Sequence, residues 1–479
     1  MSDRKILRGA LLLDASRPEG WRGPVDLIIR AGRIAAITRP DETPEGPGDM
    51  VIDARGRLAA PGLVNAHTHS QSSTMAGFGD RLSHPAFMWL TQAHTSRRTP
   101  DEIRLAVLLT AWGMLSTGAT AAIDHFPGQR FDARDLDAVM SAWEETGLRV
   151  ALGMLFFDAD FSDIIPESLP EGLKRQLEGV ELLKPQPLAG LGDLFEHAVG
   201  AWNGRGGRLS VFPAPSNPDR CTDAALELCA ETAERHDLGI HTHLLETRKQ
   251  AAIARSRHGC GPVAHLTSLG VLSDRWSCAH SIWLDEAEMA LMADHGATAV
   301  LNPESNARLG TGLAPIPRLR AARVPLALGT DGSGSNDNLA MHEAMRAIAT
   351  AHRAEEPDRS RWLGAREAFA IATTGGARAM RGPPGMGTLA VGAPADLALY
   401  RLDAPWWTPI NDAVAQMVFA ETGAGVDLVM TAGEVLLRDG RPTRFDPVEL
   451  AAEVSAMSAS LRRRNADLFE AAQAVAAVA

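Results

Sequence analysis

Short apolar runs recur along the middle of the chain, separated by longer polar or helix-forming stretches. Runs of this length are typical of strands buried on both faces of a parallel sheet. They lie at residues 58–69, 120–124, 149–155, 209–212, 238–243, 276–280, 297–301 and 324–331. Helical stretches such as 99–115 and 223–235 lie between them. Eight strands alternating with helices favour a (β/α)8 barrel at residues 58–384. A doubly wound sheet is the alternative, but no G-x-G-x-x-G turn follows the first strand.

The two ends of the chain carry a different pattern of short strands and turns. Strand-like runs occupy residues 6–13, 25–30, 34–37, 51–54, 426–430 and 434–437, and residues 392–400 form a turn followed by a strand. The N-terminal group is too small to enclose a stable core alone. We therefore predict an α/β protein in which residues 1–57 and 385–445 pair into one small β-sandwich, with the barrel inserted between them. A helical tail at 446–479 should pack on the outside.

Composition narrows the class of protein. The 479 residues carry a formal net charge of −12 and no basic patch, which argues against nucleic-acid binding. The longest basic run, at 462–464, falls in the predicted tail helix and should face solvent. The cysteines lack C-x-x-C spacing, which favours buried thiols over disulfides. With no signal peptide and no apolar run of membrane-spanning length, we expect a cytoplasmic protein.

Histidines and acids follow several of the predicted strands, at the end where barrels place their chemistry. In the first strand His67 and His69 share a face, because side chains alternate along a strand. The histidines and acids at the strand ends are, in chain order, His67, His69, His241, His243, Glu246, His280 and Asp331. Imidazoles and carboxylates from separate strands predict a metal site.

These residues stand in five motifs, H-x-H, H-x-H-L-x-E-T, A-H, N-P-x-S-N and G-T-D-G. The motifs occupy residues 67–69, 241–247, 279–280, 302–306 and 329–332. Their order resembles that of the metal-dependent amidohydrolase superfamily, in the branch of cytosine/guanine-type aminohydrolases and triazine hydrolases. The flanking β regions match as well, so the resemblance covers nearly the whole chain.

The resemblance implies a ligand set and a mechanism. One divalent metal, zinc or alternatively iron, would be bound by His67, His69, His243 and Asp331. Such a metal lowers the pKa of a bound water from 15.7 to roughly 7, so that the water can attack a ring carbon bearing an amino group. Glu246 would protonate the adjacent ring nitrogen. His280 would hydrogen-bond the attacking oxygen, and Asp331 would pass a proton to the departing ammonia.

The same resemblance bears on the number of metals and on His241. Binuclear members of the superfamily usually bridge two metals with a carboxylated lysine on the fourth strand. No lysine occurs here between Lys184 and Lys249, which predicts one metal per chain. The H-L-x-E pattern places the ligand at His243 and leaves His241 as a structural neighbour of uncertain role.

Other polar residues near the strand ends are weaker candidates. Substrate binding and a purely structural role are both open for Trp89, Asp124, His125, Asn306, Ser333 and Asn336. Histidines without a partner pattern are expected to be ordinary surface or core residues: His84, His94, His258, His295 and His342.

Departures from the family pattern bear on the substrate. Adenosine-type deaminases of this branch carry H-E-W-L, whose Glu reads ribose hydroxyls, but residues 87–90 here read Phe-Met-Trp-Leu. They also carry a His after the fourth strand, and residues 214–218 have none. We therefore expect a hydrolytic deaminase of a free purine, oxidised purine or pterin base rather than of a nucleoside.

Three alternatives stay open. The first is hydrolysis of another ring substituent or of a cyclic amide, and the second is an adenosine-type nucleoside deaminase. The third, a metal-free structural relative, is disfavoured by the intact ligand set. We expect a small heterocycle as the partner, no nucleic acid and no membrane, and a homo-oligomer, a dimer or larger.

Overall fold

Parallel strands form the centre of the computed structural model, which describes residues 4–126, 132–159, 164–166, 168–178, 180 and 183–478. Within these residues the first parallel sheet runs β6 (Leu63–Thr68), β7 (Ala119–Phe126), β8 (Arg149–Phe156) and β9 (Leu209–Pro215). The second runs β10 (Ile240–Leu244), β11 (Trp276–His280), β12 (Thr298–Leu301) and β13 (Leu326–Leu328). The strands predicted for the middle of the chain are confirmed, except that the predicted strand 58–69 is divided between two sheets.

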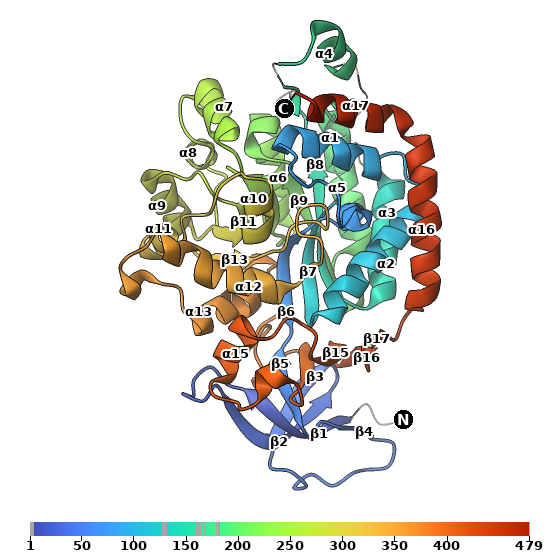
Figure 1. Cartoon of the computed structure of the whole chain (residues 1–479), viewed down its shortest axis with the longest axis vertical. Helices are drawn as coiled ribbons and strands as arrows, with labels where there is room; N and C mark the ends of the chain where they lie inside the picture. Colours follow the sequence, from blue (N-terminus) through green and yellow to red (C-terminus); the bar gives the residue numbers. More distant parts are fainter. Residues whose placement is uncertain are drawn as a thin grey trace.

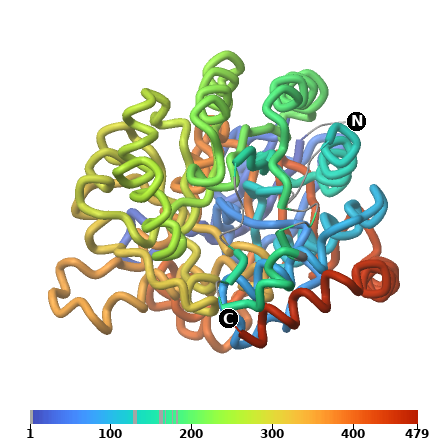
Figure 2. The backbone as a smooth tube through the Cα atoms, turned by 90° about the horizontal axis from the view of Figure 1, so that it is seen from above, coloured from blue at the N-terminus to red at the C-terminus, as the bar shows by residue number. Residues whose placement is uncertain are grey.

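Backbone hydrogen bonds join the two parallel sheets at both of their edges. The amide of His243, in β10, donates to the carbonyl of Ser216, just after β9, at 3.2 Å. The amide of Asp331, after β13, donates to the carbonyl of His67, in β6, at 2.9 Å. The carboxyl ends of these strands therefore meet around one site, and helices surround the strands (Figure 2).

Helices follow most of the parallel strands. Their bounds are α1 (His84–Thr95), α2 (Pro100–Ser116), α3 (Ala133–Thr146), α4 (Glu171–Glu178), α5 (Leu188–Trp202), α6 (Asp223–Arg235), α7 (Arg248–His258), α8 (Pro262–Ser268), α9 (Glu286–His295), α10 (Pro303–Arg308), α11 (Ile316–Ala321), α12 (Met341–Thr350), α13 (Ala365–Ala370), α14 (Gly376–Ala379) and α15 (Ala413–Phe419). Local signals explain their ends: Thr99 and Glu102 form a capping box before α2. Gly147 ends α3 with φ 78°, which glycine adopts without strain.

The two ends of the chain pair, as predicted, at the bottom of Figure 1. The strands form one mixed sheet in the order β17 (Arg441–Pro442), β16 (Glu434–Arg438), β15 (Val426–Thr431), β14 (Leu397–Arg401), β5 (Arg57–Pro61), β1 (Lys5–Leu13), β2 (Trp21–Arg30) and β3 (Arg33–Thr38), with β4 (Met50–Asp53) beside β1. A bridge between Arg33 and Pro394 brings the far edge back toward β14. The described strands at the chain ends thus bend around one apolar core in a single sheet, where a two-sheet sandwich was predicted.

The chain crosses from the end sheet to the parallel sheet at Gly62. The sequence predicted one strand through residues 58–69, but the structure divides it into β5 and β6. The Gly62 amide donates to the Asp396 carbonyl, and a Cβ at Gly62 would lie 2.1 Å from the Thr120 hydroxyl oxygen. Only glycine fits this close approach, which explains why a continuous apolar run serves two sheets.

The C-terminal tail is helical, as predicted, in α16 (Pro447–Arg464) and α17 (Ala466–Ala476), drawn in red in Figure 1. Leu468, Ala472 and Val475 of α17 pack in one apolar cluster with Ala86 and Trp89 of α1. The tail therefore supports α1, the helix that follows the first histidine strand. In the described part of the chain, no helix combines the length and the apolar character needed to cross a membrane. The domain boundaries at 57, 384 and 445 stay predictions.

A buried ion pair links the parallel strands to the end sheet, and breaking it should destabilise the protein. Arg149 Nε, in β8, lies 3.0 Å from Asp396 Oδ2, and the side chains are 7% and 2% exposed. Asp396→Ala leaves the guanidinium of Arg149 buried without its carboxylate partner. We therefore expect the free energy of unfolding to fall by about 3–5 kcal/mol. Calorimetry should show a lower unfolding midpoint. Arg55→Ala, which removes an exposed pair with Asp53, should leave it unchanged; equal midpoints for the two variants would contradict the argument.

Candidate metal centre and active site

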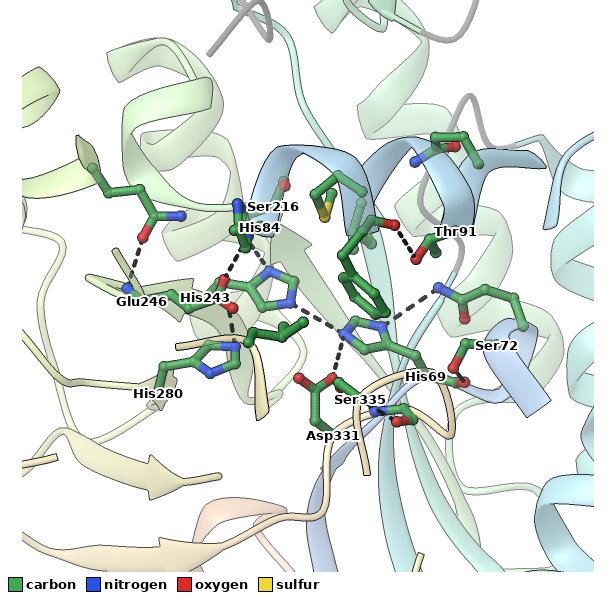
Figure 3. A pocket seen from close by; sticks show the side chains of 18 of the residues that line it. His69, Ser72, His84, Thr91, Ser216, His243, Glu246, His280, Asp331 and Ser335 are labelled. Atoms are coloured by element: carbon green, nitrogen blue, oxygen red, sulfur yellow. Dashed lines mark hydrogen bonds and ion pairs between the residues drawn. The ribbon is translucent and has the colours of Figure 1, made fainter. Parts of the chain in front are cut away.

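Three imidazoles and one carboxylate face a common point at the carboxyl ends of the parallel strands. His69, His243 and Asp331 point toward one another in Figure 3. The Nε2 atoms of His69 and His243 are 3.2 Å apart. Asp331 Oδ1 lies 3.3 Å from His69 Nε2 and 3.6 Å from His67 Nε2. The four side chains predicted as ligands are thus brought together.

The spacing of these atoms fits a bound metal ion. A tetrahedral ion with ligand bonds of roughly 2.0–2.1 Å holds its ligand atoms about 3.3–3.4 Å apart. The separations of 3.2, 3.3 and 3.6 Å lie close to this value. In addition, the buried Nε2 of His67 has no hydrogen-bond partner among the described residues. Buried polar atoms are nearly always satisfied, so a ligand bond to a metal explains this one.

Partners on the opposite ring nitrogen orient two of the imidazoles. His69 Nδ1 donates to the His125 carbonyl, and His243 Nδ1 donates to the Ser216 carbonyl, each at 2.6 Å. A carbonyl oxygen only accepts hydrogen bonds, so both Nδ1 atoms carry the proton. Each ring therefore presents its Nε2 lone pair to the metal position.

His241, whose role the sequence left open, orients His67. Its Nε2 lies 2.8 Å from His67 Nδ1, and its Nδ1 lies 2.8 Å from the Ser277 hydroxyl. That hydroxyl donates to the Ile240 carbonyl, so it accepts the proton of His241 Nδ1. His241 Nε2 in turn accepts the proton of His67 Nδ1, which leaves the His67 Nε2 lone pair for the metal.

Burial keeps these rings in the form that binds metal. Burial lowers the pKa of His67, His241 and His243, and the neighbouring imidazoles lower it further, for His241 to about 3. The rings are neutral at pH 7, and neutral imidazole is the ligating form.

Backbone strain gathers at the same strand ends. His280 and Asp331 have φ values of 71° and 63°, in the left-handed region that residues other than glycine rarely adopt. Hydrogen bonds hold Asp331 there: Oδ2 accepts from the Ser305 hydroxyl at 2.6 Å and Oδ1 from the Gly332 amide at 2.7 Å. These hydrogen bonds keep the carboxylate turned toward the imidazoles.

Glu246 and His280, predicted as catalytic, lie beside this cluster. His280 Nε2 is 3.9 Å from Glu246 Oε2, and His280 Nδ1 is 2.8 Å from Asn306 Oδ1. Burial alone would raise the pKa of Glu246, but electrostatic interactions with the His280 and His84 rings and a hydrogen bond from His84 lower it overall. The two neighbouring imidazoles therefore favour the ionised form of the Glu246 carboxylate.

A pocket adjoins the cluster and holds the predicted catalytic groups in its wall (Figure 3). Its lining includes Glu246, His280 and Asp331, together with the imidazoles of His69 and His243. Titratable groups that converge in a pocket are what an active site requires.

Helix α1 forms another part of the pocket wall. Met88 lines the pocket. The position at which related deaminases carry a Glu for the ribose hydroxyls therefore does face the substrate. His84, expected to be an ordinary histidine, lines it as well, with Nε2 3.3 Å from Glu246 Oε2. The spacing in the sequence could have indicated that His84 lines the pocket. His84 stands four residues before Met88, and residues four apart share a helix face.

Six weaker candidates for substrate binding are not among the described residues that line the pocket: Trp89, Asp124, His125, Asn306, Ser333 and Asn336. Trp89 is fully buried, and its indole donates to the Ile164 carbonyl. Asp124 accepts hydrogen bonds from Ser70 and from the Trp143 indole. These two positions favour the structural role that the sequence left open, because strand ends and helices also need polar groups that fix loops and packing.

The other four of these candidates have structural positions too. The His125 carbonyl orients His69, and the buried His125 imidazole belongs with those of His67, His69 and His243 to one group that could hold a metal ion. Asn306 orients His280, and Asn336 donates to Glu304 at 2.6 Å. Ser333 is buried. They support the site from outside the pocket.

Another possible ligand group lies away from this pocket, in Asp223, His258 and His265. The two imidazoles stack with centroids 3.7 Å apart and planes 21° from parallel. Asp223 is exposed and His258 only partly buried, whereas every member of the strand-end cluster is buried or partly buried. His265 Nε2 already bonds Asp223, at 2.8 Å. The strand-end cluster is therefore the better metal centre.

Comparison with known proteins agrees with this centre. The chain matches the amidohydrolase family over residues 58–436. It is 32% identical to a 5-methylthioadenosine/S-adenosylhomocysteine deaminase of Desulforudis audaxviator, over 88% of this chain and 91% of that protein. It resembles in structure a zinc-bound adenosine deaminase of Xanthomonas campestris, at TM-score 0.82 and 25% identity, covering 96% and 98% of the two chains. A zinc-bound atrazine chlorohydrolase of Arthrobacter aurescens TC1 is similar too, at TM-score 0.82 and 25% identity, covering 95% and 100%.

The fold and the site define a metal-dependent hydrolase, and the chain belongs to the amidohydrolase family. It is an enzyme that acts on carbon–nitrogen bonds. The resemblance inferred from the sequence motifs is confirmed. The relatives named for deamination carry nucleoside substrates in their names, where the sequence predicted a free purine or pterin base for this chain.

Proposed function

We propose that the protein is a zinc-dependent hydrolytic deaminase of a purine nucleoside, an adenosine modified at its 5′ position. The observation that carries the proposal is the intact set of His67, His69, His243, Glu246 and Asp331 around one pocket, in a chain that aligns over 88% of its length with a deaminase of this class. Three imidazoles and a carboxylate suit zinc.

Each group in the site has a task in such a reaction. Bound zinc would supply a water with a pKa of roughly 7. Asp331 is placed to accept the proton of that water, since its Oδ2 is held by Ser305 and its Oδ1 faces the imidazoles. His280 donates through Nδ1 to Asn306, so its Nε2 accepts a hydrogen bond from the attacking oxygen. Glu246 would take one proton of the attacking water and carry it to the ring nitrogen next to the carbon that loses ammonia, and Asp331 would pass the other proton to the departing ammonia.

Polar groups in the pocket support a nucleoside despite Met88. The sequence argument rested on a missing carboxylate and a missing histidine, but amide and guanidinium groups also line the pocket. They are Gln71, Gln92 and Arg220, from η1 (Ser70–Met75), α1 and η5 (Pro218–Arg220). Such donors and acceptors suit ribose hydroxyls or a polar 5′ substituent.

Ammonia release from a matched panel tests the proposal. The zinc-loaded protein is incubated with 5′-methylthioadenosine, S-adenosylhomocysteine, 5′-deoxyadenosine and adenosine, and with adenine, guanine and a pterin as the free bases. We expect kcat/KM for the best nucleoside to exceed that of every base by at least tenfold, because contacts to the sugar add binding energy in the transition state. A base turned over faster than every nucleoside would contradict the proposal.

Hydrolysis of another ring substituent is a second candidate. It is favoured by the structural similarity to atrazine chlorohydrolase and by the apolar Met88 in the pocket wall. A chlorinated triazine that loses chloride, with no ammonia from any amine, would support this activity in place of deamination.

We also propose that the two parallel sheets close into one eight-stranded barrel at residues 58–384. The backbone bonds from His243 to Ser216 and from Asp331 to His67 support this closure. Assembly into a homo-oligomer and a cytoplasmic location stay predictions.

A further inference from the structure

Two imidazoles approach the same oxygen of Glu246. His84 Nε2 lies 3.3 Å from Oε2, and His280 Nε2 lies 3.9 Å from it. His280 donates its Nδ1 proton to Asn306, so the Nε2 of the neutral ring carries a lone pair and offers no proton to the carboxylate. His84 is therefore the ring that donates to Oε2.

Helix α1 fixes the His84 ring in this place. His84 is the first residue of the helix, Ser83 caps it by accepting from the Ala86 amide, and Pro85 follows at a position that favours a helix start. The face with Ala86 and Trp89 packs in the apolar cluster with α17. The His84 side chain is 14% exposed and that of Glu246 is 9% exposed, so the contact is largely shielded from water.

We propose that His84 is a positioning residue of the active site, which donates to Glu246 Oε2 and thereby turns Oε1 toward the substrate ring. The proposal rests on the proposed deaminase function. A Glu246 carboxylate that rotates freely would present either oxygen to the substrate. When His84 donates a hydrogen bond to Oε2, rotation stops and Oε1 keeps one orientation toward the ring nitrogen. Orientation of this kind is a large part of what catalytic groups gain from their surroundings.

The same contact gives His84 a role that Met88 cannot take. Both residues line the pocket from one face of α1, one turn apart. Met88 offers only apolar surface to the substrate, while His84 reaches across the pocket from α1 to the segment after β10. Thus the helix that walls the pocket also holds the proton-transferring group.

A double-mutant cycle with Glu246 tests this role. We expect His84→Ala to lower kcat by about 10–100-fold with KM changed less than about threefold, since the group lost acts on the carboxylate rather than on the substrate. In the Glu246→Gln background, His84→Ala should lower kcat by less than about threefold more, because the carboxylate it orients is gone. Losses that multiply across the cycle, or a rise in KM alone, would overturn the proposal.

Two further variants separate positioning from folding. His84→Asn keeps a donor at the helix start and should recover part of the lost kcat. Thr95→Ala lies on the last turn of α1, where its hydroxyl bonds only the Thr91 carbonyl among the described residues, and should leave kcat unchanged. If Thr95→Ala matched His84→Ala, the effect would belong to the helix and the proposal would fail.

A spectroscopic readout does not depend on which substrate the enzyme takes. In the metal-loaded protein with 15N-labelled histidines, the NMR signal of His84 is the one that disappears in His84→Ala. We expect its titration midpoint to fall by about one pH unit in Glu246→Gln, because the negative charge that favours its protonated form is removed. An unchanged midpoint would overturn the contact. If the midpoint shifts but no nucleoside is deaminated, the proposed function fails while the His84 contact stands.

Discussion

Glu246→Gln should lower kcat by about 10²–10⁴-fold while the protein keeps its full metal content. The amide keeps the shape of the side chain but cannot accept and return a proton, and a proton transfer of this kind contributes about that factor. Glu246 lies outside the cluster formed by the Nε2 atoms of His69 and His243 and by Asp331 Oδ1, so metal binding should not change. Steady-state kinetics and elemental analysis measure the two quantities.

A second buried carboxyl group provides a matched control. Burial and the nearby Glu343 raise the pKa of Glu304 to about 8, and its Oε2 accepts from Asn336 at 2.6 Å. The group is largely protonated at pH 7, so Glu304→Gln replaces one neutral side chain by another and should leave kcat near normal. Near-normal turnover in Glu246→Gln would show that the proton-transfer role is misassigned.

His243→Ala should release the metal. Changes to groups that only orient a ligand already weaken metal binding about 10–100-fold, so loss of a ligand should exceed that range. The wild-type chain is expected to hold one metal ion, and dialysis against a chelator followed by elemental analysis should find His243→Ala empty and inactive. Two tightly held ions in the active wild type would contradict the single site.

His295→Ala is the matched histidine control for this variant. His295 lies at the end of α9, where its Nδ1 bonds the Leu291 carbonyl. The variant should keep one metal ion and full activity. Full metal content in His243→Ala, under conditions where His295→Ala also keeps its ion, would remove His243 from the ligand set.

The metal centre was predictable because its residues obey local rules. His67 and His69 are two apart on one strand, so strand geometry alone puts them on one face. The motif around His243 and Glu246 and the position of Asp331 after the last predicted strand placed the remaining groups at the same edge.

The support around the ligands was not predictable to the same degree. The H-L-x-E pattern placed the ligand at His243 but left the role of His241 open, and only the contacts with His67 and Ser277 identify His241 as an orienting ring. For Asn306 and His125, which stand at strand ends, the sequence left substrate binding and a structural role both open. The structure uses Asn306 to orient His280 and the His125 carbonyl to orient His69.

The sequence by itself determined the parallel strands, the pairing of the chain ends and the order of the metal ligands, since each depends on spacing along the chain. The tertiary structure alone decided that the apolar run from residue 58 serves two sheets and that His84 meets Glu246. Both outcomes depend on packing between distant segments: Gly62 against Thr120, and α1 against α17. Periodicity encodes which face a side chain takes, but not which distant side chain it meets there.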